Sequence, residues 1–318
     1  MGSPALAAVP PRPELLRPPR VGVGDKVAVV ATAGVVPPSR LNAGIARLES
    51  WGLRVHVGEH VLDVETSLSY LAGSDAERAA DFTAAWTDAE VAAVMLARGG
   101  YGTQRLIELL DWELLASAQP KILVGFSDAT ALHSAVAGRL GLVTVHSHVV
   151  TSLGGAATAS AEALRVLLMQ PESVGDLLAG SPVRVVTPGR VTGVLVGGNL
   201  ALLASEVGTP FWRPARDAIV VLEDVLETPY RIDRLLTQLL RAGWFEGARG
   251  VVLGSFTECG DAAEVEAVLV DRLCPLGVPI LAGLDFGHTH TSATIPLGVQ
   301  ATLDTADPSL RLEQPPLA

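Results

Sequence analysis

The sequence predicts an α/β protein whose first half forms a parallel β-sheet covered by helices. Short, continuously apolar segments such as 26–32 (KVAVVAT) and 91–97 (VAAVMLA) have the length and composition of buried strands. Segments with a helical pattern separate them, which is the order expected for parallel strands. The chain has 318 residues, 49% hydrophobic and 18% charged, so it can bury a core and has the length of two domains.

Strands and helices alternate through residues 26–170. We expect strands at 26–32, 53–57, 91–97, 122–126 and 142–146, and helices at 39–51, 74–86, 103–110 and 128–138. Ser74, followed by Glu77, has the spacing of a capping box at the start of the second helix. Ligands of parallel sheets bind beyond the carboxyl ends of the strands, so the loops at those ends are where a site is expected.

The second half begins after a change of composition at 171–188, where QPESVGD and TPG indicate a linker. Further strands are expected at 191–198, 218–224, 250–256, 278–284 and 294–304, with helices at 199–207, 229–242 and 261–273. The predicted organisation is therefore a flexible proline-rich tail (1–20), a first domain (21–170), the linker (171–188) and a second domain (189–318).

Composition excludes several classes of function. The net charge of −11 argues against a nucleic-acid partner, which would require basic patches. No run of eighteen apolar residues predicts a membrane span, and the proline-rich start does not have the pattern of a secretory signal. Cys259 and Cys274 do not form a C-x-x-C pair and suit a reducing compartment. We therefore expect a cytoplasmic protein.

Ser127 lies where a predicted strand passes directly into a predicted helix. The apolar segment 122–126 precedes it and the helical segment 128–138 follows it. A serine on such a sharp turn has the placement of a nucleophile elbow, with amides nearby that can form an oxyanion hole. The alternative is that Ser127 or Asp128 only caps the helix, because both residue types are favoured caps.

A nucleophilic serine needs a base and a carboxylate that orients the base. Of the seven histidines, His288 is the candidate base, because it lies in a glycine- and threonine-rich loop after an apolar strand. A purely structural loop histidine is the alternative. Glu223 and Asp224 end an apolar strand, and only one can face the serine because adjacent strand residues point to opposite faces. A solvated strand end would explain the pair equally well.

The glycine-rich loop 98–102 (RGGYG) follows the third predicted strand and can bring backbone amides close to a reacting carbonyl. The amides of Gly100 and Asp128 are the candidate oxyanion donors. A phosphate cradle is the rival interpretation, but the spacing matches neither G-x-G-x-x-G nor a P-loop. A plain glycine turn also remains open.

Taken together, these segments resemble the LD-carboxypeptidase family of serine peptidases, which includes muramoyl-tetrapeptide carboxypeptidases and microcin C self-immunity proteins. The matching segments follow the family's order and are YLAGSDAERAADF (70–82), ARGGYGTQRLIELLDW (97–112), GFSDATALH (125–133), GGNLALLASEVGTPF (197–211), LEDVLETPYRIDRLLTQL (222–239) and GHTHTSATIPLGVQATLD (287–304). The resemblance implies a Ser127-Glu223-His288 triad with Gly100 in the oxyanion hole. It also implies a flavodoxin-like N-terminal domain, a C-terminal swivelling β/α domain, and a cytoplasmic homodimer.

The implied reaction is acyl transfer to water without a cofactor. By resemblance, the substrate is the amide between the L-centre of meso-diaminopimelate and the terminal D-alanine of a murein tetrapeptide. Arg98, Arg231 and Arg234 are candidates for binding the terminal carboxylate, and surface or interface ion pairs are the alternative for each. Where many members of the family read H-G-P, this chain has His-Ser-His at 146–148.

Three other functions stay open. A self-resistance or biosynthetic peptide amidase could use the same triad. A metal-dependent hydrolase could use His146, His148, His288 and His290 as zinc ligands, although Ser127 would then have no role. A non-enzymatic protein could bind a nucleotide or sugar at its glycine loops.

Overall fold

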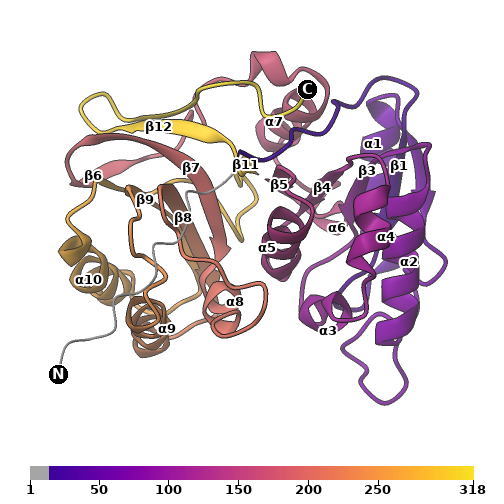
Figure 1. The fold of residues 1–318 in the computed structure, drawn as a ribbon, viewed down its shortest axis with the longest axis horizontal. Coiled ribbons are helices and arrows are strands. Elements are labelled where there is room, and N and C mark those ends of the chain that lie inside the picture. Colours follow the sequence, from indigo (N-terminus) through magenta and orange to yellow (C-terminus); the bar gives the residue numbers. More distant parts are fainter. Residues whose placement is uncertain (1–13) are drawn as a thin grey trace.

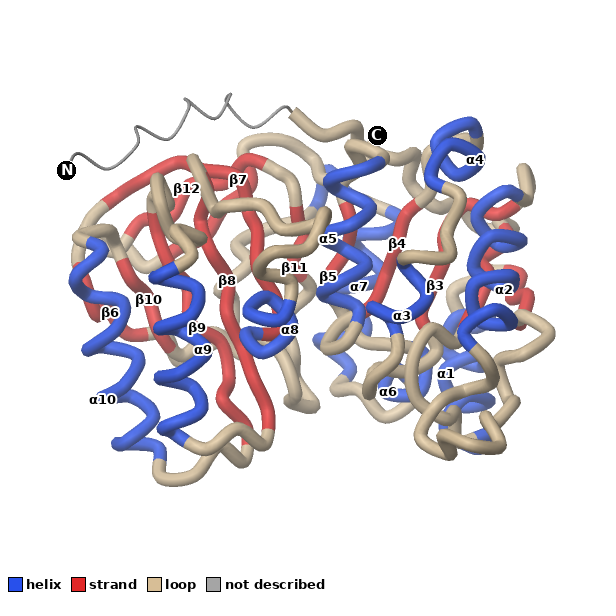
Figure 2. The backbone as a smooth tube through the Cα atoms, turned by 60° about the horizontal axis from the view of Figure 1, so that its bottom comes forward, coloured by secondary structure: helices blue, strands red, loops and turns tan. Residues whose placement is uncertain are grey.

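The structure, a computed structural model, describes residues 14–318, which form two β-sheets flanked by helices (Figure 1). The tail expected at 1–20 falls mostly outside this range. Helix α5 (Ala129–Arg139) lies between the two halves of the molecule (Figures 1 and 2). Within the described residues, no helix is long and apolar enough to cross a membrane.

The first sheet has the strand order β11-β5-β4-β3-β1-β2. Its parallel strands are β1 (Lys26–Val30), β2 (Arg54–Val57), β3 (Val91–Leu96), β4 (Ile122–Gly125) and β5 (Thr144–His146). The order 2-1-3-4-5 is that of flavodoxin-like sheets, and it confirms the fold class predicted from the sequence. An edge strand, β11 (Ile295–Leu297), pairs antiparallel with β5.

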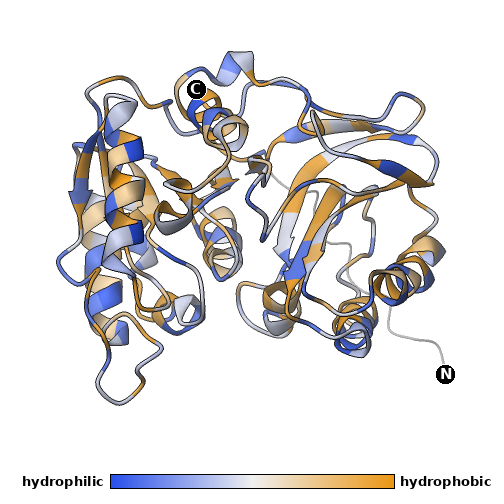
Figure 3. Cartoon of the chain, turned by 180° about the vertical axis from the view of Figure 1, so that it is seen from behind, coloured by the Kyte–Doolittle hydropathy of each residue, from blue (hydrophilic) through white to orange (hydrophobic). Residues whose placement is uncertain are grey.

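Both faces of this sheet are buried, which explains why its strands are continuously apolar. In β1, Val27 and Val29 belong to the core on one face, whereas Ala28 and Val30 belong to the core on the other. The strands accordingly carry the most hydrophobic colouring, while the helices are mixed (Figure 3).

The helices of this half pack on the two faces of the sheet. They are α1 (Pro38–Ser50), α2 (Asp75–Thr87), α3 (Thr103–Ile107), α4 (Trp112–Ser117), α5, α6 (Val150–Leu153) and α7 (Thr158–Met169). The predicted capping box is present, because the Glu77 amide donates to Ser74 Oγ and the Ser74 amide donates to Glu77 Oε2. The sequence did not indicate α4, α6 or α7. The first two are too short to show a periodicity, and α7 has no side-chain cap.

The second sheet has the order β13-β12-β7-β8-β9-β10-β6. Its strands are β6 (Arg184–Thr187), β7 (Arg190–Asn199), β8 (Ala218–Val225), β9 (Gly250–Thr257), β10 (Ile280–Ala282), β12 (Gln300–Asp304) and β13 (Ser309–Leu312). The central strands β7 to β10 are parallel, and the outer strands are antiparallel to their neighbours. Helices α8 (Leu200–Ser205), α9 (Pro229–Arg241) and α10 (Ala262–Leu273) share one core beneath it.

Two segments have a place in the sheets that the sequence did not indicate. The segment 171–188, expected to be a linker, contains β6, which pairs with β10 at the edge of the second sheet. Two of the four residues of β6 are exposed, so it lacks the apolar run of a buried strand. Conversely, β11 extends the first sheet although it belongs to the C-terminal part of the chain. The domain boundaries themselves stay predictions.

Candidate active site

Ser127 lies on the turn between β4 and α5, where the backbone is strained. Its φ angle is +65°, in the left-handed region that residues other than glycine rarely adopt. Backbone hydrogen bonds to Phe126 O (3.3 Å) and Ser127 O (2.9 Å) hold the turn. Neither Ser127 nor Asp128 caps the helix with its side chain, so the capping alternative is not what the geometry supports.

A chain of hydrogen bonds links Ser127, His288 and Glu223 across the two sheets. Ser127 Oγ lies 3.0 Å from His288 Nε2, and His288 Nδ1 lies 2.7 Å from Glu223 Oε2. An ionised carboxylate only accepts, so His288 donates through Nδ1 and leaves Nε2 to accept from the serine hydroxyl. The three residues come from the turn after β4, the loop after β10 and the strand β8.

The buried Glu223 carboxylate is held from both sides. Its side chain is fully buried, and Asn199 Nδ2 donates to Oε1 over 3.2 Å. A Cβ atom at Gly287 would lie only 2.4 Å from Glu223 Oε2, and Gly287 has a φ of +108°. Glycine at this position therefore lets the loop carrying His288 approach the carboxylate.

The loop that carries His288 is fixed by its own polar groups. Thr289 Oγ1 donates to Asp285 Oδ1 over 2.5 Å, and Thr291 donates to the other carboxylate oxygen. The Gly287 amide donates to Ser292 Oγ over 2.9 Å. The imidazole also packs against Phe126, with ring centroids 4.9 Å apart. These contacts restrict the imidazole to one orientation.

The glycine loop 98–102 lies directly against Ser127. A Cβ atom on Gly99 would be 3.0 Å from Ser127 Cβ and 3.3 Å from its Oγ. Gly100 has a φ of +119°. Within residues 14–318, neither the Gly100 amide nor the Asp128 amide donates a hydrogen bond to another group. Both donors therefore remain available for a ligand.

The three candidate arginines have different surroundings. Arg231 forms an ion pair with Glu227, and Arg234 stacks over the Tyr230 ring with its Cζ 5.4 Å from the ring centroid. Arg98 is exposed, precedes Gly99, and donates to the carbonyl of Val35. Among the described residues, only Arg98 of these three has neither a carboxylate nor an aromatic ring as its partner.

The match to known proteins is extensive. The LD-carboxypeptidase N-terminal domain profile matches residues 27–147, and the corresponding C-terminal domain profile matches residues 192–303. A Streptomyces coelicolor protein named as a carboxypeptidase is 50% identical, with 96% of this chain and 98% of that protein covered. The chain belongs to the LD-carboxypeptidase family. It is accordingly a serine carboxypeptidase, a hydrolase of peptide bonds, as the sequence predicted.

Further members of the LD-carboxypeptidase family match most of this chain. The murein tetrapeptide carboxypeptidase of Pseudomonas aeruginosa is 36% identical, covering 89% of this chain and 94% of that protein. The crystal structure of muramoyltetrapeptide carboxypeptidase from Oxalobacter formigenes has a TM-score of 0.75 and 30% identity, covering 90% of this chain and 97% of that one. The microcin-immunity protein MccF, in complex with glutamyl sulfamoyl guanosine, shares the fold with a TM-score of 0.85 at 23% identity, covering 96% and 100%.

Three other histidines, His133, His146 and His148, are buried in the structure. Burial lowers the pKa of His133 and of His148 to about 4, and it lowers the pKa of His146 well below its usual value. His133 Nε2 donates to Gly125 O over 2.9 Å, and the His146 ring packs on Phe286 with centroids 4.4 Å apart. In the His-Ser-His segment 146–148, Ser147 Oγ forms a hydrogen bond of 2.7 Å with Thr294 Oγ1. This hydrogen bond joins the residue just after β5 to the residue just before β11.

The histidines proposed as zinc ligands in the metal alternative do not converge. In the part of the chain that the structure describes, the group with metal-ligand spacing is His60, Asp63 and Glu77, far from Ser127 in sequence. Glu77 already accepts the Ser74 amide in the capping box, and His60 pairs with Asp63. The geometry therefore favours a serine hydrolase.

Asn199 lies at the site but was not singled out from the sequence. Asn199 follows the glycines of GGN and contacts both acids of the E-D pair, at 3.2 Å from Glu223 and 2.9 Å from Asp224. Burial raises the pKa of Asp224 to about 6. A polar residue directly after an apolar strand and two glycines was the available signal for Asn199.

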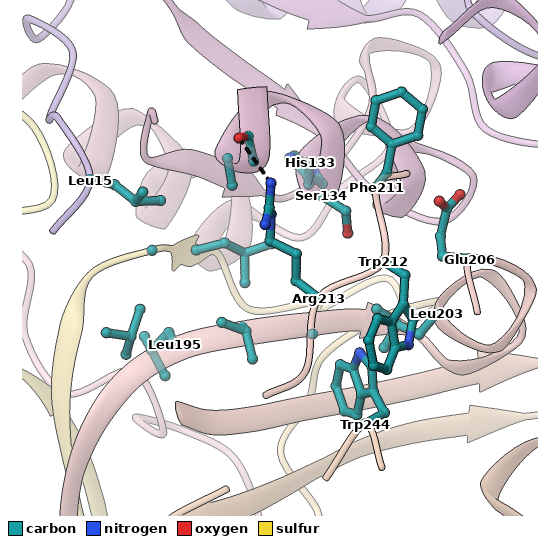
Figure 4. A pocket seen from close by; sticks show the side chains of 17 residues that line it. Leu15, His133, Ser134, Leu195, Leu203, Glu206, Phe211, Trp212, Arg213 and Trp244 are labelled. Atoms are coloured by element: carbon teal, nitrogen blue, oxygen red, sulfur yellow. Dashed lines mark hydrogen bonds between the residues drawn. The ribbon is translucent and has the colours of Figure 1, made fainter. Parts of the chain in front are cut away.

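A separate cavity of about 240 Å³ lies between α5 and β7. Aromatic side chains, among them Trp212 and Trp244, form one wall, and Arg213 donates to the carbonyl of Gly138 across it (Figure 4). Ser127 and His288 do not line this cavity. It is therefore distinct from the candidate active site.

Proposed function

We propose that Ser127, His288 and Glu223 form a catalytic triad that removes the terminal D-alanine from a murein tetrapeptide. The observation that carries this proposal is the unbroken hydrogen-bond chain of 3.0 Å and 2.7 Å through His288. A strained serine on a strand-to-helix turn adds support, because backbone strain concentrates at functional sites. The bond attacked joins the L-centre of meso-diaminopimelate to D-alanine.

In the first step, His288 Nε2 takes the hydroxyl proton as Ser127 Oγ attacks the amide carbonyl. The Glu223 carboxylate, buried and held by Asn199, stabilises the imidazolium that forms. The amides of Gly100 and Asp128 would bind the oxyanion, each donor typically contributing about 10²–10³ in rate. His288 then protonates the amino group of D-alanine as the carbon–nitrogen bond breaks. Water next attacks the acyl-serine with His288 as base, which releases the tripeptide.

The substrate carboxylate needs a cation near the scissile bond. Arg98 is the best candidate to bind this carboxylate, because it adjoins Gly99 and has no carboxylate partner among the described residues. A planar guanidinium can bind a carboxylate with two parallel hydrogen bonds. The ion pair of Arg231 and the ring contact of Arg234 make these two less suited.

A microcin-type or biosynthetic amidase is the alternative on the same scaffold. The 36% identity to a murein tetrapeptide carboxypeptidase, against 26% to the MccF of Escherichia coli, favours the murein substrate. By the same family argument, we infer a cytoplasmic homodimer. Sedimentation of the purified chain tests the dimer, and fractionation of the producing cells tests the location.

The deciding experiment incubates the purified chain with a murein tetrapeptide and with its all-L analogue, and follows the loss of alanine by mass spectrometry. We expect cleavage of the first peptide only, and no cleavage by a folded Ser127→Ala variant. An active Ser127→Ala variant would refute the triad. Cleavage of an aminoacyl sulfamoyl nucleoside but not of the tetrapeptide would instead favour the microcin-type alternative.

A further inference from the structure

The Asp128 carboxylate bridges the nucleophile turn and the glycine loop. Asp128 occupies the N-cap position of α5, yet its side chain does not bond the amides of its own helix. Instead, Oδ2 accepts the backbone N–H of Thr103 over 2.8 Å, and the residue is only 1% exposed. Because Thr103 begins α3 directly after the loop 98–102, this bond ties that loop to the residue next to Ser127.

The same peptide unit is held at its other end by a buried cation. Arg78 Nη1 donates to the carbonyl of Gly102 over 2.9 Å, and Arg78 is fully buried. The Gly102 carbonyl and the Thr103 N–H belong to one peptide plane. A guanidinium therefore holds its oxygen while a carboxylate holds its nitrogen. Arg78 also donates to the carbonyl of Thr32 and to Asp75, which fixes the guanidinium itself.

A glycine-rich loop needs such external anchoring. Gly100 and Gly102 both have positive φ angles, +119° and +137°, and glycine backbones can adopt many other conformations. The loop leaves no room for a side chain at Gly99, where a Cβ atom would be 3.0 Å from Ser127 Cβ, so a small rotation of the loop would displace the free Gly100 amide relative to the serine. Oxyanion donors act only when held in place before the reaction.

Burial of these charges argues for a specific task. An isolated carboxylate or guanidinium is costly to bury, and a neutral side chain could satisfy one amide at lower cost. Here the two opposite charges lie at the two ends of one peptide. Burial raises the pKa of Asp128 and lowers the pKa of Arg78, and the opposite charge offsets part of each shift. The neighbouring sheet core does not require either charge, because its strands are apolar on both faces.

We propose that Asp128 and Arg78 are positioning residues that clamp the Gly102–Thr103 peptide and thereby aim the Gly100 amide at the oxyanion formed on the substrate. This inference rests on the proposed function. Asp128 then contributes twice, with its own amide as an oxyanion donor and with its carboxylate as the anchor of the second donor.

The test compares Asp128→Ala, Asp128→Asn and the wild type on the murein tetrapeptide. Loss of one oxyanion donor predicts a fall in kcat of about 10²-fold for Asp128→Ala, with KM changed less than about 3-fold. Asp128→Asn keeps an oxygen that can accept a hydrogen bond from the Thr103 amide. We therefore expect its kcat to be at least about tenfold higher than that of Asp128→Ala. Arg78→Lys keeps the positive charge but places all its N–H donors on a single nitrogen, so it should lower kcat by about tenfold; it serves as the test if Asp128→Ala does not fold.

A second readout separates positioning from a merely structural role. A boronic-acid analogue of the peptide forms a tetrahedral adduct on Ser127, so its binding should weaken in Asp128→Ala by the same factor as kcat/KM. Binding of the intact tetrapeptide, measured in a Ser127→Ala background, should stay within about 3-fold because the ground state makes no oxyanion. Equal weakening of both ligands would overturn the proposal.

Asp111→Ala is the matched control. Asp111 also accepts backbone amides, at the start of α4, but it lies outside the site. The Asp111→Ala variant should have lower thermal stability and a kcat within about twofold of the wild type.

If Ser127→Ala is inactive but Asp128→Ala retains full kcat, the clamp is refuted and the triad stands. If Ser127→Ala is active, the proposed function itself fails.

Discussion

Asn199 donates a hydrogen bond of 2.9 Å from its side-chain nitrogen to Asp224, and the same nitrogen lies 3.2 Å from Glu223. The two acids nevertheless have different tasks. Asp224 also accepts the amides of Ala201 and Val225, so its carboxylate organises the start of α8. Glu223 directs its second oxygen to His288. The alternation of strand β8 thus gives one acid to the helix and the other to the imidazole.

This division predicts unequal effects for two conservative variants. Glu223→Gln keeps the shape of the side chain but removes the charge that supports the imidazolium and its tautomer. We expect kcat to fall by about 10⁴-fold, as when the acid of a catalytic triad is made an amide. Asp224→Asn should lower kcat less than about tenfold, because it affects His288 only through Asn199.

Steady-state kinetics on the murein tetrapeptide measure both effects, with circular dichroism to verify that each variant is folded. A larger loss for Asp224→Asn than for Glu223→Gln would contradict the assignment. It would mean that Asp224 orients the imidazole, directly or through a rearranged strand end.

Gly99 offers a steric test of the same site. An alanine methyl there would lie 3.0 Å from Ser127 Cβ and 3.3 Å from Oγ, so the serine or the loop must shift. We predict that Gly99→Ala lowers kcat by about 10²-fold while the protein stays folded, since a misplacement near 1 Å costs about that factor. Gly175→Ala is the control, because a methyl group on Gly175 would meet no atom within 4 Å. Wild-type kcat in Gly99→Ala would show that the loop does not constrain Ser127.

The sequence was sufficient to predict the placement of Ser127 and Gly100, because both follow strands of a parallel sheet and such sheets present their ligands at one edge. It was not sufficient to predict Asn199. Its contact with Glu223 depends on the register of β7 against β8, in which these two residues are paired. A register between distant strands is set by the whole sheet and leaves no local pattern.

Arg78 and β11 illustrate the same limit. In α2, Arg78 is one charged residue among several, and only packing of that helix against the loop 98–102 shows that its guanidinium is buried. Strand β11 has three residues with Pro296 at its centre, and the sequence predicts it together with β12 as one strand at 294–304, so nothing local assigns it to the first sheet. Its edge position is what tolerates a proline.

Arg98 should affect substrate binding more than chemistry. If its guanidinium binds the terminal carboxylate, Arg98→Gln removes a bidentate ion pair that exists before and during the reaction. We therefore predict a rise in KM of about 10-fold to 100-fold with kcat within about 3-fold. Arg234→Gln, which loses only a ring contact with Tyr230, is the control and should leave KM within about twofold. Identical kinetics for the two variants would remove Arg98 from the binding site.

The buried histidines predict that the protein loses stability in acid. The pKa of His133 is lowered from 6.5 to about 4 by burial, so between these values the unfolded chain binds a proton that the folded chain does not. The free energy of unfolding must then fall as pH decreases from 6.5 to 4. His146 and His148 shift in the same direction, whereas the raised pKa of Asp224 acts in the opposite direction.

His133→Gln isolates one of these contributions. Glutamine can still donate to the Gly125 carbonyl, as His133 does over 2.9 Å, but it does not titrate. Urea denaturation at pH 7.5 and at pH 5 should show that the wild type loses about 2 kcal/mol more than His133→Gln between the two, since each pH unit below 6.5 costs nearly 1.4 kcal/mol. Parallel losses in the two proteins would mean that His133 is protonated, or exposed, in the folded state.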